Sequence, residues 1–185
     1  MSFIEQIKQR AKQEIKTIVL PEATDVRILE AAQIVKKEGY AKVILIGNEE
    51  EVKNLANEKN IDLGETKIID PSKSEETERY AKELYELRKA KGMTEEQANQ
   101  LVLEPVYYGM MMVKLNEADG LVSGAAHSTS DTLRPALQIL KTAPGTKLVS
   151  AFFVMVVPDC KYGENGTFIF ADSGLNEEPD SEKLS

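Results

Sequence analysis

The segment from Asp119 to Pro135 contains the residue types best suited to bind an anion. It reads as a short strand, a turn of small residues and the beginning of a helix near Ser128. The N–H groups in the first turn of a helix have no partner inside the helix, and the positive end of the helix dipole favours negative charge. The hydroxyls of Ser128, Thr129 and Ser130 would add donors of little bulk. The pattern predicts a phosphate or carboxylate site here, completed by nearby backbone N–H groups.

Arg134 would lie one turn into the same helix. Its planar guanidinium suits phosphate oxygens better than a lysine ammonium would. A simpler interpretation is that Ser128, Ser130 or Asp131 caps the helix, which is a frequent role for these residue types. No glycine-rich dinucleotide or P-loop motif accompanies the segment. The residues alone leave both interpretations open.

Other residues limit the kinds of site that the chain could form. His127 is the single histidine and Cys160 the single cysteine, which excludes an internal disulfide framework and zinc sites built from several such residues. We therefore expect no metal site. Arg88 lies at the end of a predicted helix, Glu75–Lys91, where positive charge complements the helix dipole. By pattern alone, a structural role as a helix-end charge is favoured for Arg88 over contact with a ligand.

Composition excludes several classes of protein. Hydrophobic residues make up 42% of the 185 residues and charged residues 29%, which is typical of a globular protein. No apolar run approaches the roughly 20 residues of a membrane helix, and the charged N-terminus lacks the apolar region of a signal peptide. A net charge of −8 argues against binding to nucleic acid or to a membrane surface. We expect a cytoplasmic protein that holds an anionic ligand with individual arginines.

Alternating strands and helices must position these residues. Strands are predicted at Thr17–Leu20, Lys42–Ile46 and Lys67–Ile69, and helices at Phe3–Gln13, from Asp25 to Gly39, and at Glu49–Asn57. This alternation predicts an α/β fold with a mostly parallel sheet and helices on both faces. Ligands of such sheets gather at the carboxyl ends of the strands. Pro21–Thr24, Gly47–Asn48 and the Asp119–Pro135 segment all fall there, so we expect them to share a crevice.

The later part of the chain suggests a second domain. After the Glu75–Lys91 helix, further helices are predicted at Thr94–Leu103 and Val106–Asn116, and strands at Leu148–Val157 and Thr167–Phe170 that form an antiparallel hairpin. Pro144 and Gly145 indicate a boundary. We predict a first α/β domain over residues 1–144 and the start of a second over residues 145–185. A helix start at Pro179–Ser185 with no helix after it leads us to expect a truncated chain.

Several segments together form a family signature. They are Val19–Glu22, Leu45–Asn48, Tyr85–Lys89, Asp119–Lys141, Val157–Cys160 and Phe170–Ser173. In residues and in order they resemble the N-terminal part of the phosphate acetyltransferase, or phosphotransacetylase, family. The resemblance implies reversible transfer of an acetyl group between coenzyme A and inorganic phosphate, which gives acetyl phosphate. It also implies two α/β domains, a homodimer, and coenzyme A as a substrate with no tightly bound cofactor.

The resemblance also implies roles for individual residues. Family arginines that hold the coenzyme or phosphate correspond to Arg88 and Arg134, with Arg27 as a third. These arginines join Ser128, Thr129 and Ser130 as the predicted substrate-binding residues. Cys160 matches a cysteine near the active site of relatives that is not a required nucleophile.

One family motif is missing from this sequence. The family has a second motif of Asp-Leu-Ser-Arg-Gly type, whose serine, arginine and following aspartate position phosphate and activate the thiol. No Asp-Leu-Ser-Arg occurs here, so we assign no catalytic residue and expect a structural role for His127. The sequence predicts half of an active site. A phosphate butyryltransferase and a non-catalytic fragment that binds coenzyme A or phosphate are the alternatives.

Overall fold

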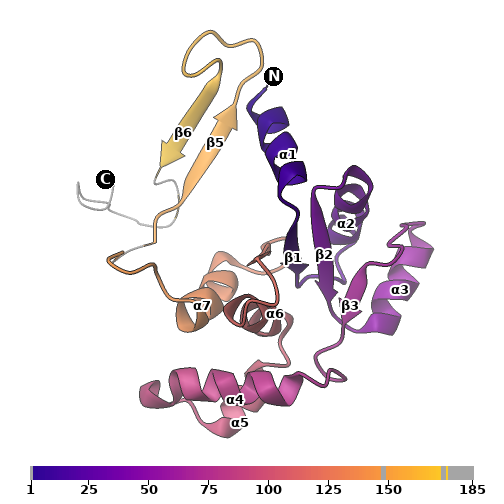
Figure 1. The fold of residues 1–185 in the computed structure, drawn as a ribbon, viewed down its shortest axis with the longest axis vertical. Coiled ribbons are helices and arrows are strands. Elements are labelled where there is room, and N and C mark those ends of the chain that lie inside the picture. The colour runs from indigo at the N-terminus through magenta and orange to yellow at the C-terminus, as the bar shows by residue number, and fades with distance from the viewer. Residues whose placement is uncertain (1, 147–148, 172–173, 175–185) are drawn as a thin grey trace. The chain divides into compact units, whose positions relative to one another are not determined.

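The computed structural model describes residues 2–146, 149–171 and 174 (Figure 1). The chain divides into two units: residues 8–141 form one, and residues 1–7 with residues 142–185 form the other. Helix α1 (Phe3–Gln13) has the predicted bounds. The predicted helix start at Pro179–Ser185 lies outside the described residues, as does Leu148, where the first hairpin strand was expected to begin.

A four-stranded parallel sheet forms the centre of the larger unit. Its strands lie in the order β3-β2-β1-β4, with β1 at Lys16–Leu20, β2 at Ala41–Ile46, β3 at Lys67–Ile69 and β4 at Gly120–Leu121. Val19 of β1 pairs with Ile44 on one side and with Leu121 on the other. The predicted parallel α/β sheet is confirmed, and β4 brings the segment that begins at Asp119 beside β1.

The two faces of this sheet contribute to two hydrophobic clusters. Val19 and Ile44 belong to one cluster, whereas their chain neighbours Leu20 and Leu45 belong to the other. The alternation follows from the period of two in a strand, which points successive side chains to opposite faces. The Leu20 cluster receives side chains from helices α2 (Val26–Glu38) and α3 (Glu49–Glu58). The Val19 cluster receives them from four helices: α4 (Thr77–Arg88), α5 (Glu95–Leu101), α6 (Pro105–Lys114) and α7 (Thr129–Ile139). Helices on both faces were predicted, and this is confirmed.

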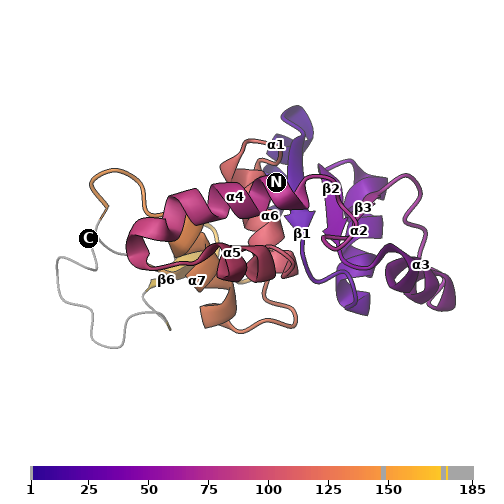
Figure 2. The same cartoon turned by 90° about the horizontal axis from the view of Figure 1, so that it is seen from below.

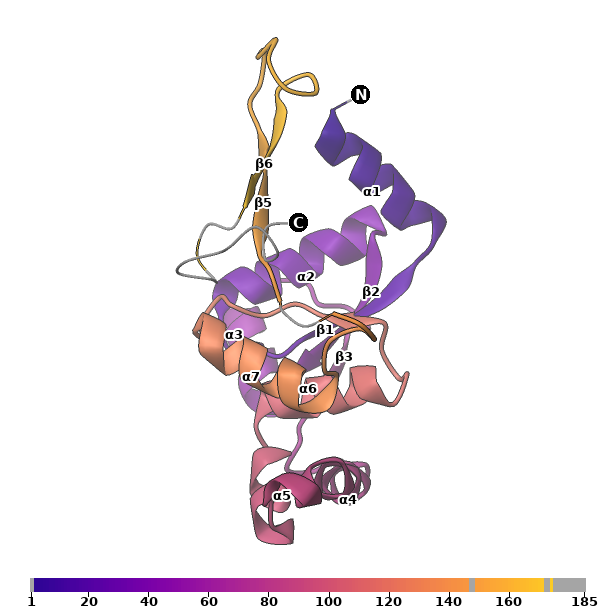
Figure 3. The same cartoon turned by 90° about the vertical axis from the view of Figure 1, so that its left-hand side faces the viewer.

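Local signals set several helix ends. The Asp25 side chain accepts the N–H of Arg27 at the start of α2, and Gly39 ends the helix with a φ of 68°. Thr94 and Gln97 form a capping box at the start of α5. The predicted helix Glu75–Lys91 begins later, at Thr77, and its last residues, Lys89–Lys91, tighten into a 3₁₀ turn. Figures 2 and 3 show α4 beside α5.

Helix α6 fills the core beneath the sheet. Met110, Met111 and Met112 are buried together with Tyr108 and serve as adaptable core residues. In the smaller unit, β5 (Phe152–Val156) pairs antiparallel with β6 (Thr167–Ala171), as the predicted hairpin requires.

We expect Gly109→Ala to lower the free energy of unfolding by about 1–2 kcal/mol, because overpacking outweighs the higher helix propensity of alanine. A Cβ at Gly109 would lie 2.6 Å from Cδ1 of Leu121 and 2.9 Å from Cγ1 of Val19. Urea denaturation of the purified variant measures the loss. Leu121→Ala in the same chain should recover part of it, and two additive losses would contradict the contact.

Candidate functional site

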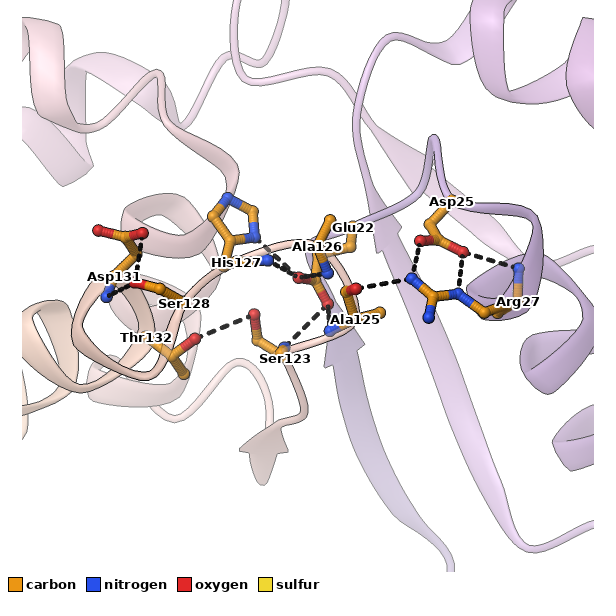
Figure 4. Close-up of polar contacts among 11 residues, drawn as sticks. Glu22, Asp25, Arg27, Ser123, Ala125, Ala126, His127, Ser128, Asp131 and Thr132 are labelled. Carbon is orange, nitrogen blue, oxygen red and sulfur yellow. Dashed lines mark hydrogen bonds and ion pairs between the residues drawn. The ribbon is translucent and has the colours of Figure 1, made fainter. Parts of the chain in front are cut away.

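The turn between β4 and α7 wraps around the carboxylate of Glu22 (Figure 4). The N–H groups of Gly124 and Ala125 donate to Oε2 at 3.0 and 2.9 Å. Those of Ala126 and His127 donate to Oε1 at 2.7 and 2.8 Å. Successive backbone N–H groups that converge in this way form an anion-binding nest. The turn does bind a carboxylate, and the carboxylate belongs to the chain itself.

Glu22 is ionised in this environment. Only 4% of the residue is exposed, and it is the one charged residue that is buried within the described ranges. Burial raises the pKa of Glu22, but hydrogen bonds from Ala126, Ala125 and His127 together outweigh burial and lower the pKa from 4.5 to about 2. A buried carboxylate with this many donors organises the turn around itself.

The first turn of α7 follows directly. Ser128 is the N-cap: its Oγ accepts the N–H of Asp131 at 3.2 Å and its hydroxyl donates to the Asp131 carboxylate at 2.6 Å. The hydroxyl of Ser130 lies 2.8 Å from that of Ser128. The hydrogen bond from Ser128, opposed by burial, lowers the pKa of Asp131, which places a negative charge at the helix start. The capping interpretation is therefore correct for Ser128.

This arrangement bears on one expectation about the turn. Backbone N–H groups near Ser128 were expected to help hold phosphate oxygens, and those of residues 124–127 donate to Glu22 instead. The sequence did contain a signal for this contact, because Glu22 and the turn both follow strands at the same edge of a parallel sheet. A ligand at this helix would be held by the side chains of Thr129, Ser130 and Arg134, by the first N–H groups of α7, or by both.

Arg88 and Arg134 line one cavity. Its volume is about 620 Å³, and Tyr107 and Gln138 line it as well. Tyr107 donates its hydroxyl to Gln138 at 2.9 Å, and burial raises the pKa of Tyr107 against the opposing charges of Arg134 and Arg88. The Nε of Arg88 is buried, and no hydrogen-bond partner for it lies within the described part of the chain. Two guanidinium groups from distant parts of the sequence therefore converge on one space.

A smaller cavity beside the turn shares lining residues with this one. Its volume is about 220 Å³, and it is lined by His127 and Asp131. Leu101, Glu104, Tyr107 and Arg134 line both cavities. Arg134, on α7, therefore lines both the cavity beside the turn and the cavity of Arg88.

Arg27 has a different position. Its guanidinium makes two hydrogen bonds to the Asp25 carboxylate, at 3.0 and 2.6 Å, and a third to the carbonyl oxygen of Ala125 at 2.6 Å. It does not line the cavity of Arg88 and Arg134. The contact fastens the start of α2 to the Glu22-binding turn (Figure 4). The structure thus brings together two of the three predicted arginines.

No group of three or more histidine, cysteine, aspartate or glutamate side chains in the described part of the chain could hold a metal ion. Among the same residues, no helix has both the length and the apolar character needed to cross a membrane.

Comparisons with known proteins agree with this architecture. The family model described as phosphate acetyl/butaryl transferase matches residues 2–185. The chain is 63% identical to the phosphate acetyltransferase of Acetivibrio thermocellus and 52% identical to that of Thermoanaerobacterium thermosaccharolyticum, over 100% of this chain and 55% and 56% of those proteins. It therefore spans about half the length of these curated relatives.

Two solved structures share the fold. The EutD phosphotransacetylase from Staphylococcus aureus matches 98% of this chain and 53% of its own, with a TM-score of 0.87 and 40% identity. A phosphotransacetylase from Streptococcus pyogenes matches 100% of this chain and 55% of its own, with a TM-score of 0.88 and 36% identity. Sequence, sheet topology and these likenesses lead to one assignment: the chain belongs to the phosphate acetyl/butaryl transferase family.

Proposed function

We propose that this chain supplies the coenzyme- and phosphate-binding part of a phosphate acetyltransferase. The observation that supports this most is the convergence of Arg88 and Arg134 on one cavity. Both ligands of such an enzyme carry phosphate groups. One guanidinium group can bind two oxygens of a phosphate at once through parallel N–H donors. The negative net charge of −8 makes these local cations the main attraction for an anion.

The proposed reaction is displacement at an acyl carbon. The thiolate of coenzyme A attacks the carbonyl carbon of acetyl phosphate, so that a carbon–sulfur bond forms and the bond from carbon to the phosphate oxygen breaks. The electron pair of that bond leaves with inorganic phosphate. Arg134, together with Thr129 and Ser130, would neutralise and hold the phosphate, and Ser128 would cap the helix that presents them. Arg88 would bind a phosphate group of the coenzyme. Arg27 would act through the turn that it fastens.

Alternative activities remain for the same site. The family description includes butyryl transfer, whereas the curated relatives compared above are named phosphate acetyltransferase. Those names favour acetyl phosphate over butyryl phosphate. A non-catalytic fragment that binds coenzyme A is the second candidate, because the sequence contains no Asp-Leu-Ser-Arg motif.

The remaining features of the proposal follow the family resemblance. We propose a homodimer that acts in the cytoplasm with coenzyme A as substrate and no tightly bound cofactor. The domain division proposed is a first α/β domain over residues 1–144 and the beginning of a second over residues 145–185.

Binding and turnover together test the proposal. Titration calorimetry of the 185-residue chain with coenzyme A measures binding, and thioester formation from coenzyme A and acetyl phosphate or butyryl phosphate measures turnover. Turnover with a preference for acetyl phosphate supports the transferase. Binding without turnover favours the non-catalytic fragment, and a preference for butyryl phosphate favours the other acyl transfer. A chain that neither binds coenzyme A nor forms thioester would contradict the proposed site.

A further inference from the structure

The ring of His127 connects the Glu22 network with the arginine cavities. Its Nδ1 lies 2.9 Å from Oε1 of Glu22, and the residue lines the smaller cavity with Asp131 and Arg134. Figure 4 shows the other ring nitrogen, Nε2, on the side of the ring away from Glu22. One nitrogen is therefore engaged by the protein, and the other is directed away from that partner.

Glu22 determines which nitrogen of the neutral ring holds the proton. An ionised carboxylate accepts hydrogen bonds and cannot donate them. Since four backbone N–H groups already donate to Glu22, the contact with Nδ1 requires an N–H on Nδ1. The neutral ring then has a lone pair on Nε2. His127 and Arg134 both line the smaller cavity, and in the neutral ring the lone pair on Nε2 is the hydrogen-bond acceptor that His127 can offer to a ligand.

We propose that His127 determines specificity for a protonated phosphate group and that Glu22 is its positioning residue. In this arrangement the P–OH of the phosphate donates to Nε2, while Arg134 binds the ionised oxygens. The inference rests on the proposed function, which supplies inorganic phosphate and the phosphate groups of coenzyme A as ligands. Sulfate has the same shape but no proton at neutral pH, so its oxygen would face the lone pair of Nε2. The site should therefore prefer phosphate to sulfate.

Equilibrium dialysis of the 185-residue chain with radiolabelled phosphate and sulfate tests this preference. We expect the wild-type chain to bind phosphate about tenfold more tightly than sulfate, which corresponds to one hydrogen bond to a charged group. His127→Ala should weaken phosphate binding about tenfold and leave sulfate binding unchanged. Asn99→Ala, which removes an exposed polar side chain on α5, is the matched control and should change neither affinity.

A second variant separates positioning from folding. Glu22→Gln keeps the size of the side chain but can present its amide NH₂ to Nδ1, which would allow the opposite tautomer. We expect it to lose part of the preference for phosphate, measured at a temperature where circular dichroism shows the chain folded. A purely structural role for Glu22 would lower the melting temperature and leave the ratio of the two affinities intact.

The source of the phosphate group is distinguished by coenzyme A and its dephospho form. If His127→Ala weakens coenzyme A but not dephospho-coenzyme A, the group is the terminal phosphate of the coenzyme. If His127→Ala weakens the binding of inorganic phosphate alone, the phosphate group that His127 contacts is that of the substrate. An unchanged phosphate-to-sulfate ratio in His127→Ala overturns the inference alone. A wild-type chain that binds no phosphate group overturns the proposed function and this inference with it.

Discussion

Replacement of Arg134 with alanine is expected to weaken coenzyme A or phosphate binding about a hundredfold, the largest effect of any single substitution in the site. Arg134 lines both cavities, and its removal takes away a guanidinium that can form two charged hydrogen bonds with one phosphate. Hydrogen bonds to charged groups contribute roughly 1.5–3 kcal/mol each, and 1.4 kcal/mol is about a tenfold change in affinity. Titration calorimetry on the purified variant measures the loss.

Conservative and control variants make this result specific. Arg134→Lys keeps the charge but loses the planar pair of donors, so its affinity should lie between those of wild type and alanine. Arg10→Ala removes the same side chain and charge from the exposed surface of α1 and should bind as wild type does. Equal affinities for Arg134→Ala and Arg10→Ala would show that the cavity is not the binding site.

Glu22→Gln is expected to lower the free energy of unfolding by about 3 kcal/mol at neutral pH. A pKa lowered from 4.5 to about 2 corresponds to this free energy, since each pKa unit is about 1.4 kcal/mol. The amide can accept some of the backbone N–H groups, but it carries no charge and its own NH₂ faces the remaining donors. Urea denaturation followed by circular dichroism gives the difference between the two chains.

The dependence of this difference on pH identifies its source. Because the pKa of Glu22 is lower in the folded chain, the carboxylate stabilises the fold fully above the unfolded value of 4.5. That stabilisation is lost progressively as the pH falls from about 5 towards 2, so the two denaturation curves should converge over this window. Glu50→Gln, at an exposed position on α3, is the control and should show a small and nearly constant difference. If wild type and Glu22→Gln still differ in free energy of unfolding at pH 2, the lost stability comes from packing rather than from the charge.

The sequence alone determined the features that depend on residues close together in the chain. Asp25 and Gly39 bound α2, and Ser128 begins α7, because a cap acts on N–H or C=O groups within one turn of itself. The alternation of strands and helices predicted a parallel sheet with helices on both faces, and in the structure the adjacent residues Val19 and Leu20 do point to opposite faces. These are local or periodic properties, and the structure confirms them.

Tertiary structure decided what occupies the turn. The sequence predicted an anion at the Asp119–Pro135 segment, but Glu22 lies 102 residues before its first partner in the turn, Gly124. The strand ends predicted that the two share one edge of the sheet, and the pairing of β1 with β4 brings the Glu22 carboxylate into the turn itself. Likewise, Arg88 is a helix-end charge by pattern and becomes a cavity residue because α4 and α7 pack into the same hydrophobic cluster as α6. Such contacts depend on which elements become neighbours in the fold. The spacing of residues along the chain does not by itself determine which elements those are.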